Sequence, residues 1–408
     1  MTNWQTKKLG DLTQKIGSGV TPRGGSDVFV DDGVFFIRSQ NIRNNKVDMT
    51  DRKYIPKSID EKMRSSRVQK NDILYNITGA SIGRSAIYKS SLEANVNQHV
   101  CIVRIKEGSP KFVQYALSSE VGARNLWGFQ AGGNREGLNF QQLASFKIKI
   151  PEKPEQERIV GVLEVWDEYI EKLEQKIALK EQLKKGLMQQ LLTGKHRLPS
   201  FSEKWIVRKM GEFAKESRVK ESDNDVHKRL TVRLHLKGVE ARGVRGTEAV
   251  DSTQYYRRSA GQLIYGKQNI FKGSIGVVPA LYDGYASSQD IPSFDIEEAV
   301  ANVYYIYYYL SRKSIYEWLE NFAGGSGSKR LHTSEFYNIK IQLPSLEEQN
   351  AIVEVLQLAL KEIETLKKHR DVLTRQKKYL LKNLITGTIR TPEDLQPLNA
   401  SRLERSAL

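Results

Sequence analysis

The feature that most constrains this chain is an internal repeat. When the 408 residues are compared with themselves at an offset of 193, residues 147–197 match residues 340–390 without a gap, and 19 of the 51 positions are identical. The stretches that precede these segments, which begin near Trp4 and Trp205, match only weakly. A period of this length is too long for a solenoid. The chain is therefore predicted to contain two copies of one unit, each a variable globular part followed by a more similar helical part.

Both of the more similar segments carry the apolar pattern of a long helix. From 159 to 191 and from 352 to 384, seam positions alternate in steps of four and three residues, and eight of ten are apolar in each segment. A period of 3.5 residues sustained this long is typical of a coiled coil. We therefore predict that the two helices pair as an antiparallel coiled coil. The predicted pairing residues are Ile159, Leu163, Trp166, Ile170, Leu173, Ile177, Leu187, Leu191, Ile352, Leu356, Ile363, Leu366, Leu373, Leu380 and Leu384.

The alternative is that each helix packs only on its own globular domain. The seam also contains polar residues, which could fix the register, be solvated, or contact a partner subunit. A seam of this length would span roughly 48 Å at about 1.5 Å per residue, which exceeds one DNA turn of about 34 Å. The polar seam residues are Lys180, Lys184, Arg370 and Lys377.

The predicted fold class is α+β, with two mixed α/β domains separated by the two long helices. Short strand-like and turn-like segments alternate within each globular part. The expected parts are a first domain at 1–150, a first helix at 151–195, a linker at 196–204, a second domain at 205–343, a second helix at 344–388 and a flexible tail at 389–408. The expected strands include Val34–Ile37, Ile73–Ile77, Val100–Ile105, Leu230–Leu236 and Gln262–Tyr265, and the expected shorter helices are Lys111–Trp127 and Val303–Trp318.

The charge of the chain gives the first indication of function. Lys and Arg number 64 and Asp and Glu 48, so the net charge is 64 − 48 = +16. A basic protein attracts polyanions, of which nucleic acid is the usual one, although a basic surface can also serve solubility. No apolar run reaches the roughly 18–20 residues of a membrane helix, and the N-terminal segment lacks the apolar core of a secretory signal. Cys101 is the single cysteine, which fits a reducing cytoplasm.

Polar loops in both globular parts provide candidate DNA contacts. Arg and Lys can reach guanine, Asn and Gln can pair with adenine, and all four can hold phosphates, while the alternative is that the loops are only solvated. The candidates in the first domain are Thr21, Arg23, Arg38, Gln40, Asn41, Arg43, Arg84, Asn97, Gln98, Asn134 and Arg135. The candidates in the second domain are Arg233, Lys237, Arg242, Arg245, Lys267, Gln268, Lys272, Lys329 and Arg330.

The sequence shows no pattern of a catalytic or metal site. It has no phosphate-binding loop and no zinc-ligand spacing, and it lacks the tetrapeptide of amino-group methyltransferases and the acidic pattern of nucleases. His99 stands close to Cys101, but on a predicted buried strand, which favours a core pair over a nucleophile and its base. We expect a non-enzymatic chain that holds no cofactor.

The order and duplication of its motifs resemble those of the specificity subunits of Type I restriction–modification systems. The motifs lie at Trp4–Gly10, Ile150–Val160 and Leu191–Pro199, and the resemblance covers residues 1 to about 390. It implies that each globular domain is a target-recognition domain that reads one half of a split double-stranded DNA target. It also implies that the helices set the spacer and dock two modification subunits, which bring S-adenosylmethionine and methylate adenine. Two restriction subunits with ATP and Mg²⁺ would complete the assembly.

The second repeat departs from the first where the loops differ. Ser288-Gln289-Asp290 stands where the first repeat has Asn97-Gln98-His99, and no Thr-Pro follows the opening segment. We take this to mean two different half-sites and hence an asymmetric target. Two other functions stay open at this point: the specificity partner of a fused methyltransferase–nuclease of a Type II system, and a coiled-coil adaptor whose basic charge is incidental.

Overall fold

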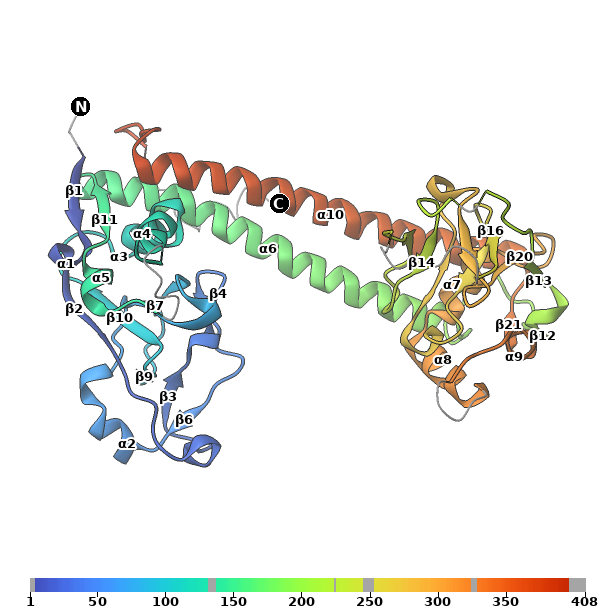
Figure 1. Cartoon of the computed structure of the whole chain (residues 1–408), viewed down its shortest axis with the longest axis horizontal. Helices are drawn as coiled ribbons and strands as arrows, with labels where there is room; N and C mark the ends of the chain where they lie inside the picture. Colours follow the sequence, from blue (N-terminus) through green and yellow to red (C-terminus); the bar gives the residue numbers. More distant parts are fainter. Residues whose placement is uncertain (1–3, 131–136, 224, 245–252, 324–328, 396–408) are drawn as a thin grey trace. The chain divides into compact units, whose positions relative to one another are not determined.

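The structure is a computed structural model, and it consists of two compact units. Unit 1 contains residues 1–174 and 368–408, and unit 2 contains residues 175–367. Both boundaries fall inside the long helices α6 (Lys153–Leu191) and α10 (Leu346–Thr386), so each unit holds one globular domain and a part of both helices (Figure 1). The residues that the structure describes are 4–130, 137–223, 225–244, 253–323 and 329–395.

The first domain is built on a four-stranded antiparallel sheet with the order β2-β10-β7-β8. Successive side chains along each strand point to opposite faces of this sheet, as strand geometry requires. Ile73 and Val103 belong to the core beneath the helices, whereas Leu74 and Ile102 belong to the core that faces a second sheet. Burial on both faces explains why these strands are almost continuously apolar. The strands are β2 (Thr13–Ser18), β10 (Val100–Ile105), β7 (Ile73–Asn76) and β8 (Ser85–Ile87).

The second sheet of the first domain has the order β6-β3-β9, in which β3 and β9 run parallel. Its strands are β3 (Val34–Ile37), β6 (Tyr54–Ile55) and β9 (Ala94–Val96). The other elements of this domain are β1 (Gln5–Lys8), α1 (Leu9–Leu12), β4 (Ile42–Arg43), β5 (Lys46–Val47), α2 (Lys57–Lys62), α3 (Pro110–Ser118), α4 (Glu120–Gln130), α5 (Phe140–Ala144) and β11 (Lys147–Ile150).

The second domain repeats the central topology of the first. Its four-stranded sheet has the order β13-β20-β17-β18, and β12 pairs with β21 as β1 pairs with β11. Two small two-stranded sheets, β14-β15 and β16-β19, accompany it. The strands are β12 (Ile206–Lys209), β13 (Ala214–Ser217), β14 (Leu230–Val232), β15 (Val239–Ala241), β16 (Tyr255–Arg257), β17 (Leu263–Tyr265), β18 (Ile275–Val277), β19 (Ala286–Ser288), β20 (Ser293–Ile296) and β21 (Lys340–Leu343), and the helices are α7 (Val303–Leu310), α8 (Lys313–Trp318) and α9 (Thr333–Tyr337). The predicted α+β class and the internal repeat are both confirmed.

The parts of α6 and α10 within each unit run antiparallel. In unit 1, Lys377 pairs with Asp167, and Arg390, just beyond α10, bonds to Glu155 near the start of α6. As residue numbers rise along α6, those of their partners on the other helix fall. Residues of both helices therefore meet in one unit, so the alternative in which each helix packs only on its own domain is wrong.

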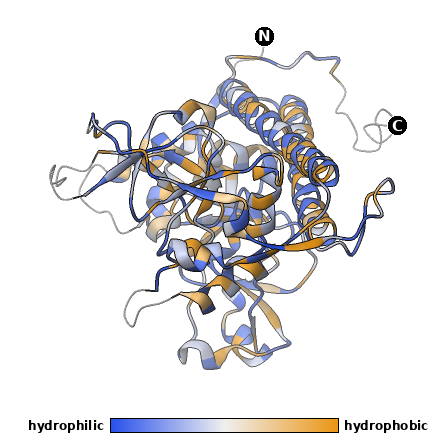
Figure 2. Ribbon diagram, turned by 90° about the vertical axis from the view of Figure 1, so that its right-hand side faces the viewer, coloured by the Kyte–Doolittle hydropathy of each residue, from blue (hydrophilic) through white to orange (hydrophobic). Residues whose placement is uncertain are grey.

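Unit 2 shows the same antiparallel arrangement. Lys180 and Glu362 form an ion pair of 2.8 Å, and Glu181 and Lys367 form one of 2.5 Å. None of the twenty seam positions in the two helices is exposed, and hydrophobic and hydrophilic residues alternate along both helices (Figure 2). Lys377 and Lys180 thus pair across the seam, and burial lowers the pKa of Lys184.

A glutamate near the start of each long helix is held by two groups from elsewhere in its unit. Glu348 accepts hydrogen bonds from Trp205 Nε1 at 3.1 Å and from the Arg197 guanidinium at 2.6 Å. Glu155 accepts the equivalent bonds from Trp4 Nε1 at 3.2 Å and from Arg390 at 2.6 Å. Each arginine follows the end of the other helix, so the start of one helix and the end of its partner are tied to the same domain.

The glutamine next to that glutamate also has the same role in both repeats. Gln156 accepts the backbone N–H of Ser109 at 2.8 Å and donates to the Pro151 carbonyl at 2.8 Å. Gln349 accepts the backbone N–H of Asn302 at 2.9 Å and donates to the carbonyls of Val300 and Pro344. Ser109 and Asn302 are the N-caps of α3 and α7. The glutamine therefore joins each long helix to the first helix of its domain.

Three expected elements are shorter than predicted. The helix at 111–127 is divided into α3 and α4 because the Ser119 hydroxyl donates to the Ala116 carbonyl and accepts the Val121 N–H, which replaces helix bonds at that point. The helix at 303–318 is also divided, into α7, which ends at Leu310, and α8, which begins at Lys313. The strand expected at 230–236 ends at Val232, since His235 and Leu236 adopt left-handed backbone angles.

In the part of the chain that the structure describes, no helix combines the length and the apolar character that crossing a membrane requires.

The shared glutamine gives a stability prediction. Replacing Gln349, which is buried, by Leu leaves the Asn302 N–H and two carbonyls without their partner, so we expect the free energy of unfolding to fall by about 1–3 kcal/mol. Urea denaturation measures it. Gln357 is exposed on the same helix, and Gln357→Leu should change stability by less than about 0.5 kcal/mol. Equal stability of the two variants would contradict the assigned role.

Candidate nucleic-acid interface

The topology of the first domain brings several polar loops to one edge of its sheets. Because neighbouring strands are antiparallel, the end of β2, the start of β10, the end of β7 and the start of β8 lie on the same side. The parallel strands β3 and β9 end there as well, since the Asn97 N–H bonds to the Ile37 carbonyl. We call this edge the first loop edge. It comprises residues 19–23, 38–45, 77–84 and 97–99.

Hydrogen bonds between these loops hold the first loop edge together. Gln98 accepts the Thr21 N–H at 2.9 Å, and His99 Nδ1 lies 2.6 Å from Thr78 Oγ1. A Cβ at Gly19 would lie 1.7 Å from the Val96 carbonyl oxygen, so only glycine allows this approach. These contacts fix the loops relative to one another.

Arginines of the first loop edge are available to bind an anion, although Arg43 Nε also donates to the Gln40 carbonyl at 2.8 Å. Arg43 and Arg84 line an open hollow of about 550 Å³ together with Asn44 and Asn45, which form a turn with left-handed angles. Neither arginine forms an ion pair with another described residue, and the same is true of the exposed Arg23. Unpaired guanidinium groups beside amides suit phosphate and base edges of DNA.

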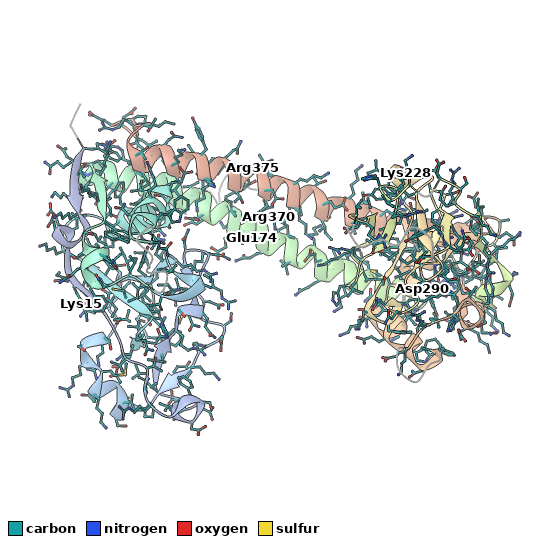
Figure 3. All side chains as sticks on the ribbon, in the orientation of Figure 1. Lys15, Glu174, Lys228, Asp290, Arg370 and Arg375 are labelled. Atoms are coloured by element: carbon teal, nitrogen blue, oxygen red, sulfur yellow. The ribbon has the colours of Figure 1, made fainter. Side chains whose placement is uncertain are left out.

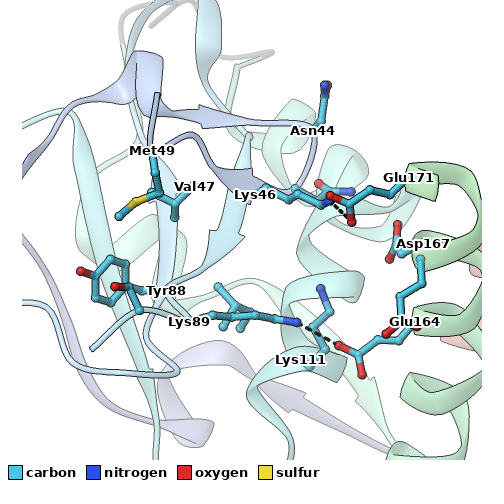
Figure 4. Close-up of a pocket in the computed structure, with 14 residues that line it drawn as sticks. Asn44, Lys46, Val47, Met49, Tyr88, Lys89, Lys111, Glu164, Asp167 and Glu171 are labelled. Carbon is cyan, nitrogen blue, oxygen red and sulfur yellow. Dashed lines mark hydrogen bonds and ion pairs between the residues drawn. The ribbon is translucent and has the colours of Figure 1, made fainter. Parts of the chain in front are cut away.

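The hairpin that carries Arg43 is also tied to helix α6. Lys46 of β5 forms a 2.5 Å ion pair with Glu171, and Lys89 forms a 3.4 Å pair with Glu164 (Figure 4). These pairs border a cavity of about 330 Å³ whose lining includes lysines of the domain and carboxylates of α6. The lysines and the carboxylates carry opposite charges, so these ion pairs hold the hairpin against α6 within unit 1.

The second domain has an equivalent second loop edge, formed by residues 233–238, 266–274, 288–292 and 329–332. The Lys267 N–H bonds to the Asp290 carbonyl at 2.9 Å, and the Leu331 N–H bonds to the Lys267 carbonyl at 3.0 Å. Asp290 is labelled in Figure 3. Lys237, Lys267 and Lys272 form no ion pair with the described residues, so this edge also offers cations.

Other predicted contact residues are engaged by carboxylates. Arg38 pairs with Asp51 at 2.9 Å, and Gln40 donates to the same carboxylate at 2.8 Å. The hydrogen bond from Gln40 and then the charge of Arg38 lower the pKa of Asp51. These contacts must open before Arg38 can hold a phosphate. In the second domain the pairs are Arg233–Glu240 at 3.0 Å, Lys329–Glu320 at 3.2 Å and Arg330–Asp290 at 3.1 Å.

Two predicted contact residues are corrected by the structure. Asn41 is 1% exposed, and its amide donates to backbone carbonyls of Asp48 and Asp51. Asn97 is 7% exposed and accepts the His99 N–H. Both shape the loops from inside, because a short polar side chain satisfies nearby backbone groups. Asn134, Arg135 and Arg245 lie outside the described residues, while Arg242 is half-buried and Gln268 is exposed.

Sequence reasoning missed Asp51, the carboxylate that holds Arg38 and Gln40, because these partners lie 13 and 11 residues away and no local pattern marks them. It also missed the buried Arg258 of the second domain, which a polar-loop search treats as an ordinary surface cation.

The structure gives no catalytic constellation among the described residues. Burial raises the pKa of Cys101 to about 12, and His99 is bonded to Thr78, so the two do not form a nucleophile and base. No group of three or more potential metal ligands occurs in the described part of the chain. Two basic loop edges on one repeated scaffold, joined by helices, define a DNA-recognition protein of the specificity-subunit type.

Comparison with known proteins agrees with this class. The family model of the Type I restriction modification DNA specificity domain matches residues 1–185 and 246–375. The chain belongs to this family and is a specificity subunit of the Type I class. The Type II alternative and the adaptor alternative are not favoured.

Individual relatives and structures show the same likeness. A putative type I restriction enzyme MjaX specificity subunit of Methanocaldococcus jannaschii is 25% identical over 95% of this chain and 94% of its own. The type I restriction enzyme EcoBI specificity subunit of Escherichia coli is 32% identical over 36% of this chain and 31% of its own. The crystal structure of a Type I S subunit from M. genitalium has a TM-score of 0.58 at 16% identity and covers 94% of this chain and 96% of its own, which shows a shared fold.

The free arginines give a prediction for DNA binding. Arg84→Ala and Arg43→Ala should each weaken DNA binding and reduce the slope of log affinity against log salt by about 0.9, because each removes one phosphate contact. A fluorescence titration across salt concentrations measures the slope. Lys70 is exposed before the start of β7, at the opposite edge of the sheet, so Lys70→Ala serves as the control. An unchanged slope in both arginine variants would exclude them from the interface.

Proposed function

We propose that this specificity subunit reads an asymmetric, two-part DNA target, with one half bound by each loop edge. The observation that carries the proposal is the repeated sheet, β2-β10-β7-β8 and β13-β20-β17-β18, which presents different side chains at equivalent places. A common scaffold with unlike loops suits two readers of unlike sequences.

The clearest difference lies in the loop before β10 and its counterpart before β20. His99 occupies this loop in the first domain, whereas Asp290 occupies it in the second. A carboxylate only accepts hydrogen bonds, for example from cytosine N4, and repels phosphate, whereas an imidazole can also donate an N–H and does not repel phosphate. The two edges would therefore prefer different bases, and the target would not be palindromic.

The two long helices are proposed to set the spacing between the half-sites. Both α6, with 39 residues, and α10, with 41, pass from one unit into the other as single helices. At about 1.5 Å per residue each measures roughly 60 Å, which exceeds a DNA turn of about 34 Å. Two half-sites separated by an unread spacer fit such a length.

The outer surface of the helices supports docking of modification subunits. With the seam at heptad positions a and d, the large apolar residues that remain exposed on α6 and α10 occupy positions c and g, which are neighbours on a helix. Their exposed fractions lie between 41% and 69%. They are Tyr169, Val372 and Tyr379 in unit 1 and Leu179, Leu183 and Leu358 in unit 2.

In an antiparallel pair the g positions of the two helices face each other, as the ring contact of Tyr169 with His369 indicates. The exposed apolar residues of each unit therefore share one face of its helix pair. Leu179 and Val372 are equivalent in the repeat, being 193 residues apart. We propose one modification subunit on each of these two equivalent faces.

The proposed assembly assigns its chemistry to the partner subunits. Modification subunits would hold S-adenosylmethionine and methylate adenine, and two restriction subunits would use ATP and Mg²⁺. This chain would contribute the choice of DNA sequence alone.

The test of the proposed function is methylation profiling of a cell that carries this chain with its modification subunit. We expect one methylated motif with two unlike halves and a fixed gap. Exchange of residues 205–343 for those of another family member should change one half and leave the other intact. A change in both halves, or a palindromic motif, would contradict the assignment of one half to each domain.

The docking face gives a separate prediction. Leu179→Asp and Val372→Asp should each weaken binding of one modification subunit by tenfold or more, because an exposed apolar contact of this size contributes about 1.5–3 kcal/mol. Native mass spectrometry counts the bound subunits and should find one fewer. Ala178 is exposed at the neighbouring position b, so Ala178→Asp controls for the charge on the helix. Retention of two tightly bound subunits by both variants would disprove this face.

A further inference from the structure

A fully buried arginine lies behind the second loop edge. Arg258 follows β16 and is 1% exposed, which is rare for arginine. Its guanidinium makes no ion pair with another described residue: Glu216 pairs with Arg218, and Asp295 accepts its bond from Gln262. Burial lowers the pKa of Arg258 to about 10, so the group stays charged at neutral pH. A buried charge without an ion pair is costly, and a chain retains one where its geometry is needed.

The Arg258 guanidinium connects four separate acceptors. Its Nε donates to Ser287 Oγ at 2.7 Å, and Nη1 donates to the Ser217 carbonyl at 2.8 Å and to Ser293 Oγ at 3.0 Å. Its Nη2 donates to the Ile291 carbonyl at 3.0 Å. These acceptors lie at the end of β13, on β19, in the loop before β20 and at the start of β20. A planar guanidinium can span such a set, whereas a single ammonium cannot.

The bonded positions bracket the part of the second loop edge that differs from the first. Between Ser287 and Ile291 lie Gln289 and Asp290, both exposed. The Asp290 carbonyl accepts the Lys267 N–H, and its carboxylate pairs with Arg330. The position of this loop therefore sets the place of two further candidate contact residues, although Arg258 itself cannot reach DNA.

The first domain holds its equivalent loop by other means. There a buried amide, Asn95, donates to Asp60 and to the Met63 carbonyl and accepts from Ser66. Both domains thus use an internal polar group behind the loop, but the groups differ in charge and in place. The two loops, which differ in sequence, are thus supported by different internal polar groups.

We propose that Arg258 is the positioning residue of the second reader: it holds residues 288–292 in the conformation that selects bases, without touching DNA. This inference rests on the proposed function, because it takes the second loop edge as a DNA-reading surface. It predicts that a change at Arg258 alters the sequence preference of one half-site more than the overall attraction to DNA.

The test uses the whole chain with its modification subunit and duplexes in which each base pair of either half-site is replaced in turn. In Arg258→Lys we expect the preference for the correct base in the second half-site to fall about tenfold or more. The preference in the first half-site and the slope of log affinity against log salt should stay as in the wild type. Arg257→Lys is the matched control, since Arg257 is adjacent, exposed and paired with Glu221 at 3.6 Å.

Several outcomes would overturn the proposal. One is a folded Arg258→Lys protein whose preference in the second half-site stays within twofold of the wild type. Another is a salt slope reduced by about one, which would indicate a direct phosphate contact. If Arg258→Lys does not fold, Ser287→Ala and Ser293→Ala, which each remove one acceptor, are judged by the same criterion. Failure of the proposed function is distinguishable, because the wild-type protein would then show no base preference at either half-site.

Discussion

The structure depends on the hydrogen bonds and ion pairs that join the start of one long helix to the end of the other. In each unit a buried glutamate, Glu155 or Glu348, receives a tryptophan indole N–H from the globular domain and an arginine that follows the opposite helix. Removing the arginine leaves the buried carboxylate without its ion pair, which is among the larger costs in protein stability. Each domain is thus held by both helices, although only one of them follows it in sequence.

This tie explains why the Glu-Gln motif and the Thr-Gly segment are so alike in the two repeats while the loops are not. The motif supplies the carboxylate and the amide that join helix to domain, and the Thr-Gly turn leads the chain to the arginine. Their partners are backbone groups, tryptophan and arginine, which leave little room for substitution. The loop edges take no part in joining helix to domain, so their side chains can differ between the two domains.

The interface shows a balance between fixed and available charge. Arg43 and Arg84 have no ion pair to another described residue, whereas Arg38 and Arg330 are held by Asp51 and Asp290. An exposed ion pair contributes little stability and exchanges readily for a phosphate. Under the proposed function, the cations without an ion pair would attract DNA, and the paired cations and buried supports such as Arg258 would determine how the loops meet it.

The sequence alone determined the repeat, the α+β class, the antiparallel pairing of two apolar seams and the family, because periodicity and duplication are written in the order of residues. Tertiary structure decided which polar residues are available. Asn41 and Asn97 look like readers in the sequence, but both are buried in the folded domain, where they bond to backbone groups within ten residues of them. Arg258 looks like a surface cation, but its four acceptors lie up to 41 residues away from it in sequence. Burial and hydrogen bonding depend on contacts between distant segments, and no local pattern carries that information.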